Sequence, residues 1–220
     1  MGSSKNLVGK ELIKYKTLLI LNKIQEEVLI GSVLGDANIR ILQKEAFLTF
    51  SHSEKQVDYV FWKYKVFQNW VLTKPREEKR IYYKNRDMYL VSWRFSTISH
   101  PLITRYYHIF YPKGKKVIPK IIDSILTSPL ALAVWYMDDG SRKPYGKGAF
   151  LHTQSFSLKD QKKLIHVLKK NFNIVARISS AGLWNGKRLH RLYIIAGSFL
   201  TFRDLIKDYI LPQFQYKISL

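Results

Sequence analysis

The chain has 220 residues, of which 46% are hydrophobic, and this is enough apolar material for one large domain or two small ones. Its formal net charge is +21, from 37 Lys and Arg against 16 Asp and Glu, which indicates a polyanionic partner. Nucleic acid is the commonest such partner, and a basic structural protein of the ribosomal kind is the alternative. The lack of cysteine excludes disulfides, Cys-ligated zinc and thiol catalysis. No apolar run reaches the roughly 18 residues of a membrane span, so we expect no membrane partner.

Residues 7–24 mix apolar positions with lysines and predict an irregular or helical lead-in. A helix is then predicted from Gln25 in QEEVLIGSVLGDA, because Glu26 and Glu27 would occupy its first turn, where the helix dipole favours acids. The first half continues with a predicted strand over 47–53, a helix over 56–72, a strand over 88–97 and a helix-like basic segment over 111–119.

A second helix is predicted over 126–140, LTSPLALAVWYMDDG. Ser128 is a natural N-cap, Pro129 suits the first helical position, and Gly140 can end the helix. The elements that follow repeat those of the first half: a predicted strand over 150–157, a helix over 158–171, a strand over 191–199 and a closing segment over 211–218.

The two halves therefore form a divergent internal repeat with a period near 103 residues, the separation of Asp36 and Asp139 (139 − 36). This period is too long for a solenoid and predicts two α+β subdomains. The predicted boundaries are a lead-in over 1–24, a first subdomain over 25–119, a linker over 120–127 and a second subdomain over 128–220.

Period-two alternation predicts strands that are apolar on one face and polar or cationic on the other. Over 88–97, Tyr89, Val91, Trp93 and Phe95 share a face, opposite Ser92, Arg94 and Ser96; over 174–179, Ile174, Ala176 and Ile178 oppose Val175, Arg177 and Ser179. An antiparallel sheet with helices behind it and a ligand in front fits this pattern, and a two-stranded ribbon fits the DNA major groove.

Asp36 and Asp139 each stand at the C-terminal end of a predicted helix, where the dipole disfavours an anion by roughly 0.3–1 kcal/mol. Either acid alone could be an ordinary turn residue, but the same departure at matching points of a repeat indicates a functional pair. Gly31 and Gly35 share a helix face and would let the second helix approach closely. The carboxylates would then converge and need a divalent cation between them. All-oxygen ligation suits Mg²⁺ and phosphodiester hydrolysis.

The segments LIGSVLGDANI and LALAVWYMDDG resemble the two signature helices of the LAGLIDADG homing endonucleases, in the single-chain branch with two motifs. The resemblance covers nearly the whole chain from about residue 25, and TQSF at 153–156, KKVIP at 115–119 and YILPQFQYK at 209–217 are similar as well. It implies an α+β fold of two pseudo-symmetric αββαββα subdomains. These would pack through the signature helices and form a saddle of two antiparallel sheets on the DNA major groove.

The resemblance also implies an activity. The chain would be a monomeric, site-specific endonuclease that makes a double-strand break in a long DNA target, leaves 3′ overhangs and promotes intron mobility. Asp36 and Asp139, the last acids of the motifs, would bind Mg²⁺, and Mn²⁺ or Ca²⁺ could occupy the same sites. Asp138 would be a structural residue at the helix end. Such proteins are typically encoded in organelle introns, which predicts a mitochondrial or chloroplast location.

The family places a basic residue beside each active centre, and the matching positions here are Lys116 and Lys217. The spacings support this pairing, since they are 80 residues (116 − 36) and 78 residues (217 − 139). Such lysines could stabilise the pentavalent phosphate, whereas the alternative is that both are solvated surface residues. Gln154 is expected to orient a water molecule in the second centre, and Ser51 is its nearest counterpart in the first.

Arginine can read guanine through two hydrogen bonds, and lysine mostly holds phosphate. The cations of the predicted strands and loops are therefore candidate DNA contacts, with about half expected to be simply solvated. The candidates are Arg40, Arg80, Lys84, Arg86, Arg94, Arg142, Lys143, Arg177, Lys187, Arg188 and Arg191. The histidines His52, His152 and His190 lack metal-ligand spacing and are expected to face DNA or solvent, whereas Trp62 and Trp70 are expected in the core.

Two other functions remain open. The first is an RNA maturase on the same fold, which would assist intron splicing with intron RNA as its partner. The second is a non-enzymatic basic RNA-binding protein, which would have no need for paired acids at helix ends. Both acids and both lysines favour the nuclease. The target sequence cannot be predicted from one chain, because it depends on side-chain conformations and DNA bending.

Overall fold

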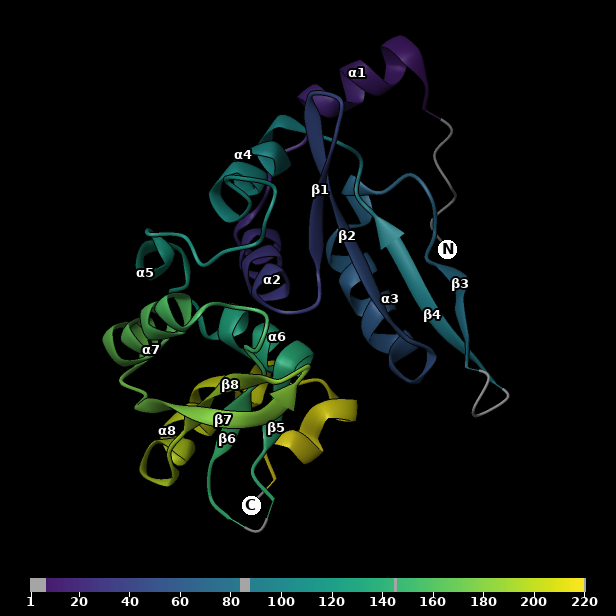
Figure 1. Ribbon diagram of the computed structural model, residues 1–220. Helices are drawn as coiled ribbons and strands as arrows, with labels where there is room; N and C mark the ends of the chain where they lie inside the picture. The colour runs from purple at the N-terminus through teal and green to yellow at the C-terminus, as the bar shows by residue number, and fades with distance from the viewer. Residues whose placement is uncertain (1–6, 84–87, 145, 220) are drawn as a thin grey trace. The chain divides into compact units, whose positions relative to one another are not determined.

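The computed structural model describes residues 7–83, 88–144 and 146–219, and Figure 1 shows its helices and strands. After α1 (Gly9–Thr17), the first series is α2 (Lys23–Leu34), β1 (Asn38–Leu42), β2 (Glu45–Ser53), α3 (Val57–Val66), β3 (Arg76–Tyr83), β4 (Met88–Ser96) and α4 (Pro101–Phe110). After α5 (Ile122–Ile125), the second series is α6 (Pro129–Asp139), β5 (Gly140–Arg142), β6 (Ala149–Leu151), α7 (Leu158–Phe172), β7 (Ala176–Trp184), β8 (Lys187–Ile194) and α8 (Ala196–Ile206). Each series is αββαββα, as expected for an α+β fold.

The four strands of each series form one antiparallel sheet, and the two sheets have equivalent orders. The first is β1-β2-β4-β3 and the second is β5-β6-β8-β7. In the described part of the chain, no helix is long and apolar enough to cross a bilayer. The predicted internal repeat is therefore a repeat of complete sheets with their helices.

The α6 helix begins and ends where its sequence predicts. Ser128 Oγ accepts a hydrogen bond from the Leu130 amide at 3.1 Å, and Pro129 occupies the first turn. Gly140 is the C-cap, and a Cβ added there would lie 2.0 Å from Cδ2 of Tyr136. No larger residue fits at position 140 without moving the Tyr136 ring, so the glycine is a packing requirement.

The chain divides into two compact units, which do not follow the linear ranges 25–119 and 128–220. The first unit contains residues 1–26 and 36–108, and the second contains residues 27–35 and 109–220. Most of α2 therefore belongs to the second unit. The linear ranges describe the sequence repeat, and as subdomain boundaries they stay a prediction.

Small residues explain why this part of α2 packs in the second unit. A Cβ added to Gly31 would lie 2.3 Å from the carbonyl oxygen of Ala131, and one added to Gly35 would lie 2.4 Å from Cβ of Asp138. Both contacts are with α6 or its last turn. The close approach of the two signature helices, predicted from the glycine spacing, is confirmed.

The core of the first unit lies between its sheet and α3. Phe50 on β2 packs against Phe67 and Phe95, with ring centroids 5.2 and 4.8 Å apart, respectively. Trp93 contacts Phe61 of α3, so Trp93 and Phe95 share the face that the alternation predicts. Ser96 hydrogen-bonds Thr49 on the opposite, polar face. Of the two tryptophans expected in the core, Trp70 is fully buried there, whereas Trp62 is only half-buried.

The second sheet is built in the same way, with α7 packed on β7 and β8. Leu151, Leu192 and Ile194 are fully buried on the core face. The opposite face carries Phe150 and, across the strand pairing, Tyr193. Each unit thus has an apolar side under a helix and a mixed polar and aromatic side away from it.

Three predicted elements have different limits in the structure. The strand predicted over 150–157 ends at Leu151, because the chain turns there: the Thr153 amide donates to the Leu151 carbonyl at 3.0 Å. The strand predicted over 191–199 ends at Ile194, and α8 begins at Ala196. The segment over 111–119 is not helical; the helix of that region is α4, which precedes it. These limits depend on tertiary contacts rather than on local residue preference.

Candidate active centres

Asp36 lies two residues beyond α2 and is the first residue of the segment 36–108 of the first unit. Its side chain is 46% exposed, and its Oδ2 lies 3.5 Å from Nδ1 of His52. His52 stands two residues after Phe50 on β2 and shares its core-facing side, so only 5% of His52 is exposed. The expectation that His52 faces DNA or solvent is wrong, because the strand alternation turns it inward against Asp36.

A buried lysine lies behind His52. Lys63 of α3 is fully buried, and its Nζ lies 3.1 Å from Nε2 of His52. The same ammonium lies 4.2 Å from the centroid of the Tyr59 ring. Asp36, His52 and Lys63 thus form a row of polar side chains that runs from the surface of the first unit into its interior.

Asp139 is the last residue of α6, and its neighbours hold the start of the second sheet in place. The carbonyl of Asp139 accepts a hydrogen bond from the His152 amide at 2.8 Å. His152 Nε2 lies 2.8 Å from Oγ of Ser141, and Nδ1 lies 3.4 Å from Nε2 of Gln154. His152 is only partly exposed, and this polar cluster connects Asp139 to Gln154 within the second unit.

The pKa of His152 is lowered, first by burial and then by the positive charges of Arg191 and Lys217. Because the unfolded chain then binds the proton more readily, the contribution of His152 to stability is present above its ordinary pKa of about 6.5 and is lost as pH falls through the lowered one. We expect His152→Asn to lose less stability than the wild type between about pH 7.5 and about pH 5 in urea unfolding. His166→Asn, at an exposed histidine of α7, is the control and should behave as the wild type. An unchanged pH dependence in His152→Asn would contradict this expectation.

The turn that carries Gln154 is held from beneath by a buried amide. Gln161 of α7 is 1% exposed, and its Nε2 donates to the carbonyls of Thr153 and Phe156 at 3.1 and 3.2 Å. Gln154 itself is half-buried. Its expected counterpart in the first half, Ser51, is a half-buried residue of β2, and this pairing stays a prediction.

Each of the two predicted lysines binds the C-terminal end of a signature helix. Lys116 Nζ donates to the carbonyl of Gly35, directly before Asp36, at 2.8 Å. Lys217 Nζ donates to the carbonyls of Met137 and Tyr136 at 2.7 and 3.5 Å. Helix C-terminal carbonyls have no partner within the helix, and a lysine there also complements the dipole.

Lys217 is the more enclosed of the two. It is 6% exposed, and its backbone carbonyl accepts a hydrogen bond from the Tyr136 hydroxyl at 2.8 Å. Lys116 is half-buried. Both ammonium groups are therefore held at a fixed helix end, and neither lysine is a freely solvated surface residue. A role of these lysines in catalysis stays a prediction.

The donor atoms at these positions suit a hard divalent cation. Mg²⁺ prefers oxygen ligands and usually takes one or two carboxylates together with water and phosphate oxygens. The half-exposed carboxylate of Asp36 can present such an oxygen, and the side chain of Asp139 is also partly accessible. The chemistry of both residues fits the predicted metal.

The predicted DNA contacts of the first sheet fall into three groups. Arg40 on β1 is exposed, whereas Arg94 on β4 is half-buried and donates to Oε1 of Glu78 at 2.7 Å. Arg80 belongs to β3, but its side chain lies outside the described part of the structure, and Lys84 and Arg86 lie outside the described residues altogether. Two cations outside the predicted set, Lys74 and Arg76, line a cavity of about 150 Å³ together with Arg94.

In the second sheet, Arg177, Lys187 and Arg188 are exposed. Arg191 is half-buried, and its guanidinium carbon lies 3.6 Å from the centroid of the Phe150 ring. The Nζ atom of Lys143 lies 5.1 Å from the centroid of the Tyr193 ring. The predicted Arg142 ends β5 and is half-buried, as is His190 on β8. The stacked cations have fixed positions, which favours contacts of defined geometry over loose attraction to phosphate.

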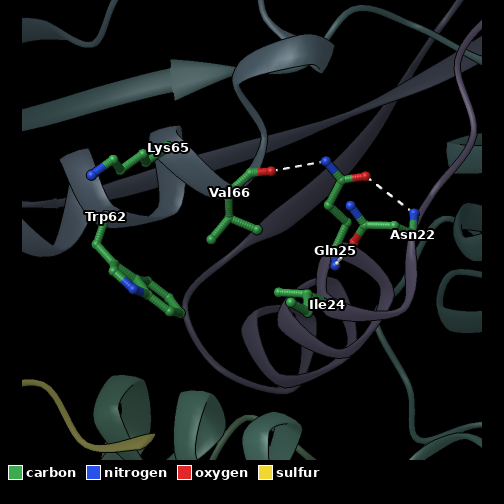
Figure 2. Close-up of a pocket in the computed structure, with 6 residues that line it drawn as sticks. All are labelled: Asn22, Ile24, Gln25, Trp62, Lys65 and Val66. Atoms are coloured by element: carbon green, nitrogen blue, oxygen red, sulfur yellow. Dashed lines mark hydrogen bonds between the residues drawn. The ribbon is translucent and has the colours of Figure 1, made fainter.

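One cavity of the first unit, of about 290 Å³, lies between α2 and α3 and is shown in Figure 2. Gln25 is its central polar group and donates to the carbonyl of Val66 at 2.8 Å. Trp62, Lys65 and Ile24 complete much of the lining. The lining has no carboxylate, so this cavity does not have the ligands of a metal site.

Residues 26–202 match the LAGLIDADG DNA endonuclease family. The chain belongs to this family. The probable intron-encoded endonuclease 1 of Wickerhamomyces canadensis is 30% identical, over 98% of this chain and 95% of that protein. The cytochrome b mRNA maturase bI2 of Debaryomyces hansenii is 30% identical, over 90% of this chain and 75% of the maturase. DNA endonuclease I-ChuI of Chlamydomonas applanata is 28% identical, over 90% and 96% of the two chains.

The structure of the homing endonuclease I-WcaI bound to its DNA recognition sequence is similar to this chain throughout. Its TM-score is 0.86 at 29% identity, and the match covers 98% of this chain and 96% of I-WcaI. The LAGLIDADG family and the α+β fold predicted from the two motifs are thereby confirmed. Asp36 and Asp139 are the last acids of the two LAGLIDADG motifs, as the sequence indicates.

Proposed function

We propose that this LAGLIDADG protein is a site-specific homing endonuclease. It makes a double-strand break in a long DNA target by metal-dependent phosphodiester hydrolysis, leaves 3′ overhangs and promotes the mobility of its intron. The observation that carries the proposal is the paired arrangement at the signature helices: each helix leads into an acid, and a lysine is bound to the carbonyls beside that acid. The similarity to I-WcaI, whose structure includes its DNA recognition sequence, supports double-stranded DNA as the partner.

The residues of each centre have separate tasks in this proposal. Asp36 and Asp139 offer carboxylate oxygens to a divalent cation, with Mg²⁺ as the physiological ion and Mn²⁺ or Ca²⁺ able to replace it. Such a cation, when bound, makes water a stronger nucleophile at neutral pH and offsets the charge of the phosphate. Lys116 and Lys217 are held by helix-end carbonyls, so their positive charge is in place before the phosphate becomes more negative. Gln154 orients water in the second centre.

Removing the divalent ion is the direct test. The protein is incubated with duplex DNA from the intronless allele of its own locus, with Mg²⁺ or with EDTA, and the products are mapped on both strands. We expect cleavage of both strands with 3′ overhangs in Mg²⁺ and no cleavage in EDTA, with DNA binding retained in EDTA. Cleavage that continues in EDTA would contradict a metal-dependent mechanism.

A second function is supported by one of the relatives, the cytochrome b mRNA maturase bI2. The chain would then assist the splicing of its intron, with intron RNA as the partner. The two functions are separated by parallel binding assays on the intronless DNA and on the intron transcript. Specific RNA binding without DNA cleavage would favour the maturase. The intron-encoded relatives also support an origin in an organelle, in a mitochondrion or chloroplast, and we propose that the protein acts there as a monomer.

A further inference from the structure

We propose that His52 and Lys63 are positioning residues for Asp36: Lys63 sets the tautomer of His52, and His52 fixes the orientation of the Asp36 carboxylate. The inference deepens the proposed function and rests on it, because it concerns how one metal-binding acid is held. It involves only residues of the first unit.

The geometry of the three side chains places His52 between Asp36 and Lys63. His52 Nδ1 lies 3.5 Å from Oδ2 of Asp36, and His52 Nε2 lies 3.1 Å from Nζ of Lys63. One imidazole ring therefore contacts the acid with one nitrogen and the amine with the other. The ring has little freedom to turn away, since it is 5% exposed and packs against Tyr59 at a centroid distance of 4.8 Å.

The hydrogen-bonding capacity of the groups then determines which nitrogen carries the proton. A lysine ammonium has three donors and no acceptor, so the Nε2 that faces Lys63 must accept. In a neutral imidazole the proton then resides on Nδ1, which faces Asp36 and can only donate. His52 thus directs an N–H at one oxygen of the carboxylate and is not itself a metal ligand through that nitrogen. The carboxylate of Asp36 is thereby held in one orientation, in which it can offer oxygen to the cation.

The position of Lys63 is unusual enough to need an explanation. Lysine is rarely fully buried, yet Lys63 is enclosed by the sheet and α3, with its Nζ over the Tyr59 ring and 5.5 Å from the centroid of Phe50. An apolar side chain would fill this core position at lower desolvation cost. Residues that orient a metal-binding side chain without touching the metal commonly change metal affinity 10- to 100-fold when they are replaced.

The tautomer of His52 is the first test and needs no variant. Long-range ¹H–¹⁵N correlation spectra of the imidazole nitrogens distinguish a protonated Nδ1 from a protonated Nε2. We expect His52 to carry its proton on Nδ1 in the wild-type protein. We also expect Lys63→Met, which keeps the volume and removes the donor, to yield a mixture of tautomers. A wild-type His52 protonated on Nε2 alone would overturn the proposal.

The second test measures Mn²⁺ binding by electron paramagnetic resonance, independently of cleavage. His52→Gln and Lys63→Met should each weaken the Mn²⁺ affinity that depends on Asp36, by about 10-fold or more. The control is His100→Gln, because His100 is a histidine of the same unit that is 8% exposed and contacts Trp70 rather than Asp36. It should leave the affinity unchanged. Thermal melting of each variant identifies any loss caused by unfolding, and Lys63→Met is expected to fold.

The outcomes separate this inference from the proposed function. If Asp36→Asn does not alter Mn²⁺ binding, the assignment of Asp36 as a metal ligand fails. If Asp36→Asn weakens binding while folded His52→Gln and Lys63→Met bind as the wild type does, Asp36 is a ligand and the positioning role is refuted. Loss of affinity in both variants with the expected tautomer supports the proposal.

Discussion

Replacement of Asp36 or Asp139 by asparagine is expected to reduce double-strand cleavage by about 100-fold or more, while binding to the DNA target is retained. Asparagine keeps the shape of the side chain but removes the negative charge that a divalent cation requires. The helix ends that carry the two acids are held by Lys116 and Lys217, so the fold has other support at these positions. Cleavage is measured as the rate of cutting of a labelled duplex, and DNA binding is measured as the affinity for the same duplex in Ca²⁺.

The matched control is Asp208→Asn, because Asp208 is an exposed acid that follows α8. It changes the net charge by the same amount and should cut as the wild type does. Undiminished cutting by Asp36→Asn or by Asp139→Asn would remove that residue from the active centre. Loss of DNA binding in both variants would instead indicate a structural role for the acids.

The second large effect is expected at Gly31, where even one methyl group has no room. A Cβ there would lie 2.3 Å from a backbone oxygen, that of Ala131, and 2.8 Å from Cβ of Val134. The backbone cannot yield without a shift of α2 against α6. We expect Gly31→Ala to lower the free energy of unfolding by about 1–3 kcal/mol in urea titrations, the usual range for overpacking.

Gly197→Ala is the control, since it makes the same change in a helix where a Cβ would meet nothing within 4 Å. There the loss of unfolded-state entropy should stabilise the protein by about 0.4–1 kcal/mol. The two substitutions should therefore have opposite signs. Equal stability of Gly31→Ala and the wild type would mean that the helices are not in direct backbone contact at this point.

The fold could be predicted from the sequence where local chemistry and tertiary packing favour the same structure. The α6 helix is such a case, because Ser128, Pro129 and Gly140 define both ends. The repeat then supplied the order of elements in each half. The limits of β6 and β8 were not predictable, because the apolar runs around Leu151 and Ile194 have no local signal for the turn after Leu151 or for the start of α8 at Ala196.

The residues of the candidate site also fall into those that the sequence indicates and those that only the structure shows. The acids and lysines repeat at matched positions, so the chain itself shows them as pairs. No such signal marks His52 and Lys63. A lysine within VDYVFWKYKV predicts a solvent-facing position, and only the packing of α3 on the sheet shows that Lys63 is buried beside His52. Burial of a charged residue is a tertiary property that a single sequence does not display.

The assignment of residues 27–35 to the second unit has a consequence for recombination between relatives. A chimera joined within 120–127 would combine a foreign segment 27–35 with the α6 of this chain, and its Gly31 and Gly35 counterparts would have to fit Ala131 and Asp138. Exchange of halves at that junction therefore conserves the sequence repeat but not the compact unit. An exchange of strands β1–β4 alone, with both signature helices kept from one parent, would leave the contacts of Gly31 and Gly35 with α6 unchanged.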